Sequence, residues 1–80
     1  MGVMPDYAFE GNGMRIDGVT DGKPAFKAGI LKGDVVMQLG ETKVASVNDY
    51  MKALGTVKKG DTVEITVSRD GKEIKMNVIF

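Results

Sequence analysis

The sequence predicts an α+β fold that is mainly β, a small, partly open antiparallel barrel of five to six strands with two helices. Three observations predict it. Segments near both ends of the chain alternate apolar and polar residues, as half-buried strands do, and turn residues separate them. Between them lies a segment with the apolar spacing of a helix. Eighty residues allow one domain, and we expect residues 1–80 to be a single domain excised from a longer chain.

The first two strands are expected to form a hairpin with a loose loop. The first spans Gly2 to Tyr7 and alternates on two faces, and Pro5 confines it to the edge of a sheet because proline lacks the N–H of a central strand. Residues 10–13, EGNG, have turn chemistry. The second strand spans Met14 to Val19.

Residues 21–39 predict a one-turn helix, a stop and a buried strand. Pro24 suits a first helical position, where its missing N–H would have no partner. Gly29 can adopt the left-handed conformation that ends a helix. We expect Ile30 and Leu31 to return to the core. The pattern ends with a turn at residues 33–34 and a strand at residues 35–39.

A second, longer helix is predicted from Val47 to Leu54. The Ser46 hydroxyl can cap its first turn, Asp49 favours its positive end, and Gly55 supplies the stop. Apolar residues at helical spacing indicate that one side lies on the sheet: Val47, Tyr50, Met51 and Leu54. A short extended pair at residues 43–44 precedes the helix, and strands at residues 61–68 and 72–80, joined by an Asp-Gly turn, close the chain.

Two segments look alike, LKGDVV at residues 31–36 and KKGDTV at residues 58–63. Glycine followed by aspartate is ordinary turn chemistry before a strand, and nothing else recurs at that period. We therefore interpret the two segments as independent turns.

The composition excludes most catalytic chemistry. The chain has no cysteine and no histidine, so it offers no disulfide, thiolate nucleophile, imidazole base or usual zinc site. Eleven basic and eleven acidic residues give a formal net charge of zero, which provides no field for nucleic acid. No apolar run is long enough for membrane insertion. We expect a non-catalytic domain that has no cofactor or metal and does not bind nucleic acid.

Two weaker chemical patterns favour structural roles. The only serines are Ser46 and Ser68, and a Ser-Lys nucleophile pair is a poor alternative because some lysine lies near any position in a chain this rich in basic residues. The acids Asp17, Asp21 and Asp34 lack the alternate-residue spacing of a calcium loop and suit turns better.

The stretch KPAFKAGILKGDVV resembles the helix and following strand of PDZ domains appended to exported bacterial peptidases. The start of the chain, MGVMPDY followed by GMRIDGV, is more similar to the PDZ domains of exported, multidomain zinc aminopeptidases than to those of heat-shock serine proteases. The resemblance implies a peptide-binding module, a parent peptidase domain in cis and a periplasmic or secreted location.

The resemblance also implies which residues bind the peptide. The carboxylate of a peptide C-terminus would lie against backbone N–H groups of a loop whose glycine lets the ligand come close. The peptide would add to the edge of the first strand, opposite the longer helix. By helical spacing, Val47, Met51 and Leu54 would share the wall of this groove, while Tyr50 and Ala53 turn toward the sheet. The implied site residues are Met1, Gly2, Val3, Met4, Pro5, Val47, Met51 and Leu54.

Residues at two places in the implied site affect which ligand it binds and how tightly. Val47 cannot donate a hydrogen bond, so we expect an apolar ligand residue two positions before the C-terminus, and the flexible Met51 predicts a permissive pocket. Pro5 removes a donor from the strand that should pair with the ligand. The alternative is a structural or regulatory docking module of the parent protein, with a vestigial or self-filled groove.

Overall fold

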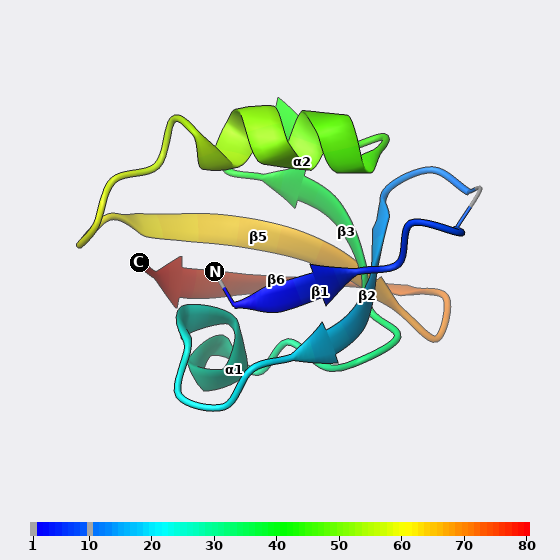
Figure 1. The fold of residues 1–80 in the computed structure, drawn as a ribbon, viewed down its shortest axis with the longest axis horizontal. Coiled ribbons are helices and arrows are strands. Elements are labelled where there is room, and N and C mark those ends of the chain that lie inside the picture. The colour runs from blue at the N-terminus through cyan, green and yellow to red at the C-terminus, as the bar shows by residue number, and fades with distance from the viewer. Residues whose placement is uncertain (1, 10) are drawn as a thin grey trace.

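The computed structural model describes residues 2–9 and 11–80 and confirms the expected mainly β fold (Figure 1). Met1 and Glu10 lie outside the described residues, so the predicted turn at 10–13 is described only from Gly11. The elements are β1 Val3–Pro5, β2 Met14–Val19, α1 Pro24–Ala28, β3 Val35–Leu39, β4 Thr42–Lys43, α2 Val47–Leu54, β5 Thr62–Arg69 and β6 Lys72–Ile79.

The strands form one antiparallel sheet with two free ends. The order is β1-β2-β3-β5-β6, and the short β4 pairs with β3 beside this path. In Figure 1, α2 lies on one side of the sheet and α1 on the other. Because β1 and β6 end the order without pairing to each other, the sheet is curved but not closed.

The first strand is shorter than predicted. It ends at Pro5 instead of Tyr7, and its register with β2 shifts between Met4 and Pro5. Tyr7 is 74% exposed. A register shift of this kind turns the backbone away from regular pairing, so the chain leaves the sheet two residues early.

The core is one cluster to which both helices and every strand except β1 and β4 contribute buried side chains. Its members are Met14, Ile16, Ala25, Ile30, Val36, Leu39, Val44, Tyr50, Ala53, Ile65, Val67 and Val78. The prediction for Leu31 was wrong, because its side chain is 55% exposed. Gly29 ends α1 in the left-handed conformation as predicted (φ 96°), and the turn that follows directs Ile30 inward and Leu31 outward.

The bounds of α2 match the prediction, but its ends are stabilised differently. The Ser46 side chain makes no capping hydrogen bond; instead Asp49 Oδ2 accepts one from the Ala45 N–H at 3.0 Å. Gly55 is right-handed (φ −65°), and the last turn tightens when Thr56 donates from N–H and hydroxyl to the Ala53 carbonyl, at 3.1 and 2.7 Å. The helix therefore ends before Gly55 as predicted, but this glycine is not left-handed, and Ser46 does not supply the predicted cap.

The two similar segments form the same turn. In each, the aspartate carboxylate accepts the N–H three residues earlier: Asp34 from Leu31 at 3.0 Å and Asp61 from Lys58 at 2.9 Å. The aspartate N–H bonds the same residue's carbonyl in return, and the intervening glycines have φ values of 94° and 93°. The shared local sequence therefore accounts for the same turn at both places.

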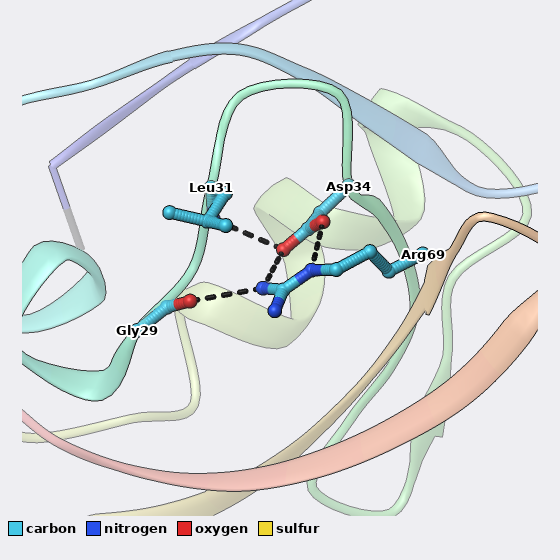
Figure 2. Close-up of polar contacts among 4 residues, drawn as sticks. All are labelled: Gly29, Leu31, Asp34 and Arg69. Carbon is cyan, nitrogen blue, oxygen red and sulfur yellow. Dashed lines mark hydrogen bonds and ion pairs between the residues drawn. The ribbon is translucent and has the colours of Figure 1, made fainter.

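Only one of these aspartates is buried. Asp34 is 1% exposed, and its two carboxylate oxygens accept hydrogen bonds from Arg69 Nε and Nη2 at 2.8 and 2.6 Å (Figure 2). Arg69 Nη2 also donates to the Gly29 carbonyl at 2.9 Å. One guanidinium thus joins the turn after α1 to the end of β5.

Burial by itself would raise the pKa of Asp34. The hydrogen bonds from Arg69 and from the Leu31 N–H, together with the positive charge of Arg69, outweigh burial and hold that pKa below its usual value. Asp34 therefore carries a negative charge throughout the neutral pH range, and that charge stabilises the fold.

We expect Asp34→Asn to destabilise the fold by about 1–3 kcal/mol, because the amide NH₂ would face the Arg69 guanidinium donors. Asp61→Asn is the matched control, since it sits in the same turn but is exposed, and its cost should stay within about 0.5 kcal/mol. Urea unfolding of both variants measures the two free energies. Equal losses would show that the turn, and not the ion pair, carries the stability.

The lowered pKa also predicts a pH dependence. The contribution of Asp34 should be fully present above the unfolded-state pKa of about 3.9 and lost as the pH falls through the lower folded-state value. The difference in unfolding free energy between wild type and Asp34→Asn should therefore be constant at neutral pH and shrink in acid. Urea unfolding at a series of pH values tests this, and a difference that does not change down to pH 2 would contradict it.

Candidate functional site

The edge of β1 is open, and backbone directions identify which residues face it. The Gly2 carbonyl accepts a hydrogen bond from the Thr20 N–H at 2.8 Å, and the Asp6 N–H donates to a carbonyl of β2 at 2.9 Å. Both groups face β2, so alternation directs the backbone groups of Val3 and Pro5 to the free edge. Pro5 has no N–H, so this short edge offers the Val3 N–H as its donor.

Met4 differs from its neighbours in the predicted site. It pairs with Gly18 of β2, so its backbone groups face into the sheet. Its side chain is 58% exposed and lies over Gly18, where an added Cβ would collide with the Met4 methyl group. Met4 therefore offers a side chain on the outer surface of the β1–β2 pair.

The predicted helical wall lies as its spacing indicated. Tyr50 and Ala53 are buried in the core, and burial raises the pKa of the Tyr50 phenol to about 12. Val47 and Leu54 are half-buried and pack against the same core, whereas Met51 is 53% exposed. α2 thus presents three apolar side chains beside its buried face.

The glycine before β1 is required by its own surroundings. Gly2 has φ 82°, which L-residues rarely adopt, and an added Cβ would overlap the Lys23 side chain, 2.6 Å from its Cγ. Sequence reasoning explained this glycine by the approach of a ligand and did not identify Lys23. Lys23 is the exposed N-cap residue of α1, so α1 brings a cationic side chain against the start of β1.

A hollow lies beyond the other end of β1. It has a volume of about 420 Å³ and opens between the loop after β1 and the start of α2. The loop contributes Asp6, Tyr7 and Phe9, and Ser46, Val47 and Asn48 line the opposite wall. Among the described residues of the predicted site, only Val47 lines the hollow. Sequence reasoning missed the rest, although two aromatic residues beside a glycine-rich turn were a usable signal.

The described parts of the chain contain neither a candidate metal site nor a candidate membrane-spanning helix. No group of three or more acidic side chains there could hold a metal ion. No helix within residues 2–9 and 11–80 is long and apolar enough to cross a membrane.

The family model of the PDZ domain matches residues 3–80. The chain is 41% identical over 66 residues to the serine protease Do-like HtrA of Lactococcus lactis subsp. cremoris, covering 82% of this chain and 16% of that protein. It is 42% identical over 57 residues to a putative zinc metalloprotease of Staphylococcus aureus, covering 71% of this chain and 13% of that protein. The chain therefore spans about a sixth or less of these relatives.

Solved structures agree on the fold. An HtrA-type protease, AlgW with a decapeptide, superposes with a TM-score of 0.88 at 22% identity over 98% of this chain and 27% of that chain. A serine endoprotease from Yersinia pestis gives a TM-score of 0.78 at 25% identity over 96% of this chain and 28% of that chain. The resemblance to peptidase-associated PDZ domains is confirmed. The narrower expectation of a zinc aminopeptidase stays a prediction, because serine proteases and zinc metalloproteases both match.

Proposed function

Because the chain belongs to the PDZ domain family, a family of non-catalytic modules, we propose that it captures a C-terminal or extended peptide segment by β-strand addition between β1 and α2. The observation that carries the proposal is the free edge of β1, where backbone groups of Val3 and Pro5 point away from the sheet. α2 supplies an apolar wall of Val47, Met51 and Leu54 above the same core.

The ligand would lie antiparallel to β1, with its carboxylate at Gly2 and the Val3 N–H. Met1 belongs to the same predicted loop but lies outside the described residues. Val47 at the start of α2 has no donor, which favours an apolar ligand side chain two positions before the C-terminus. Met51 is exposed and unbranched, so the wall adapts to several shapes.

The domain would serve a parent peptidase in cis, and residues 1–80 would be one domain cut from that longer protein. The support is the pair of relatives named above, both proteases several times longer than this chain. A periplasmic or secreted location belongs to the same proposal, since the resemblance is to domains of exported peptidases.

A second function, docking against the parent protein with the groove vestigial or filled, is favoured by one specific observation. Pro5 removes the second backbone donor from a strand only three residues long. A groove that had lost its ligand would tolerate this change.

Titration with a fluorescent pool of peptides with free C-termini separates the two functions. Binding that disappears when the same pool is C-terminally amidated supports carboxylate capture. Binding that survives amidation supports an extended internal segment as ligand. Failure of every peptide to bind would favour the docking module.

We expect Pro5→Val to strengthen binding of a C-terminal peptide by about 0.5–1.5 kcal/mol, because valine restores the N–H that a ligand carbonyl needs. Isothermal titration of wild type and variant with one peptide measures the change, and thermal melting verifies the fold. An unchanged or lower affinity with the fold intact would show that the ligand does not pair along β1. Pro5 would then serve to blunt an exposed edge against aggregation.

Lys23 provides a test of the carboxylate end. If its cation attracts the ligand carboxylate, Lys23→Gln should weaken binding about two- to fivefold, the range expected of an exposed charge pair. Amidation of the C-terminus of the same peptide should remove this difference between wild type and variant. Lys27→Gln, at the exposed far end of α1, is the control. A similar loss in both variants would show that Lys23 acts only through net charge.

A further inference from the structure

We propose that the hollow beyond β1 is a second subsite, which takes a lysine or arginine side chain of the same peptide about three to five residues before its C-terminus. This inference rests on the proposed function, because the position of the ligand residue follows from strand addition to β1. It goes beyond that function by assigning a charge to the ligand.

The position follows from strand direction. A peptide antiparallel to β1, with its C-terminus at Gly2, runs toward Pro5 and then leaves the sheet where β1 ends. At about 3.3 Å per residue, the first ligand residues past Pro5 are the third to fifth before its C-terminus. Asp6 and Tyr7 follow β1 there, and α2 begins there at Val47, so both walls of the hollow flank the outgoing peptide.

The hollow is built into the fold. The Phe9 ring covers Gly11 so closely that an added Cβ would lie 2.6 Å from its Cζ. Gly13 is buried with φ 99°, and its N–H donates to the Ala45 carbonyl at 3.1 Å, which joins the loop to the start of α2. A volume of about 420 Å³ falls within the range of small-ligand sites, roughly 300–1,000 Å³.

The lining favours a cation. Asp6 is its one charged residue among the described lining residues, and Tyr7 and Phe9 add aromatic faces that attract lysine and arginine. The sequence from Asp6 to Gly13, DYAFEGNG, has two acidic residues and no basic ones. Tyr7 is 74% exposed, so its ring is available to a ligand instead of being used in the core.

Three neighbouring groups affect how the negative charge of Asp6 can act on a ligand. Arg15 Nη1 lies 3.7 Å from Asp6 Oδ2, but the Arg15 side chain is 50% exposed and such pairs are weak, so a ligand cation can share the carboxylate. Asp6 Oδ1 accepts the Ala8 N–H at 3.0 Å, which holds the carboxylate in place. The positive end of α2 is offset by Asp49, whose carboxylate bonds the Ala45 N–H.

The test uses the tightest peptide from the pool, remade with arginine, alanine or glutamate at each of the third to fifth positions before the C-terminus. Wild type should prefer arginine over glutamate by about three- to tenfold at one of these positions. Asp6→Asn, which keeps the oxygen that accepts the Ala8 N–H, should abolish most of that preference. Asp17→Asn, an exposed acid on β2 outside the hollow, should leave it intact.

Chemical-shift mapping on ¹⁵N-labelled protein separates the two proposals. The arginine peptide should shift Val3, which reports strand addition, and also Phe9 and Gly11, which report the subsite. Shifts at Val3 with no preference for arginine at any position, or a preference that Asp6→Asn leaves unchanged, overturn the subsite while the proposed function stands. No binding of any peptide overturns both.

Discussion

The buried carboxylate of Asp34 fixes the geometry on which the open edge depends. Its side chain holds Arg69 from β5, and its backbone carbonyl accepts the Ile16 N–H of β2 at 2.7 Å. The Gly33 N–H returns a bond of the same length to the Ile16 carbonyl. One turn therefore holds β2 in place, and β2 is the strand that carries β1. The turn acts together with the pairing of β2 and β3 at Met14 and Arg15, and β1 depends on both because it pairs with β2 alone in the described sheet.

Periodicity and turn chemistry predicted most of the fold correctly. Alternation located the strands, and the helical spacing separated buried Tyr50 from exposed Met51. What local patterns could not supply was contacts between distant residues. Arg69 reaches Asp34 across 35 positions, and the sequence contains nothing that selects this arginine over the other basic residues. The prediction that Ser46 caps α2 was wrong for another reason. Both Ser46 and Asp49 can accept a hydrogen bond at the start of the helix, and the sequence does not show that the acceptor is Asp49.

In the candidate site, too, the local pattern predicted some features, whereas others depend on contacts between distant residues. Strand alternation was sufficient to direct Val3 and Pro5 to the free edge, because Gly2 and Asp6 on either side bond toward β2. Lys23 was beyond prediction, since its packing against Gly2 depends on where the chain places α1. The hollow required the loop after β1 to fold back on α2, and that contact joins residues more than thirty positions apart.

Pro5 and the hollow would have opposite effects of similar size on the affinity for a peptide. A short edge strand that lacks one donor forgoes a hydrogen bond of about 0.5–1.5 kcal/mol. A cation placed over an aromatic ring contributes a comparable amount, about 0.5–2 kcal/mol. A ligand that met both conditions would bind about as tightly as one paired along a longer strand, but its affinity would depend on side-chain charge instead of backbone pairing. Backbone hydrogen bonds are available to every peptide, whereas Asp6 and Tyr7 in the proposed subsite would discriminate among peptides by charge. The proline at the edge would thereby shift recognition from any extended peptide toward those with a basic residue upstream.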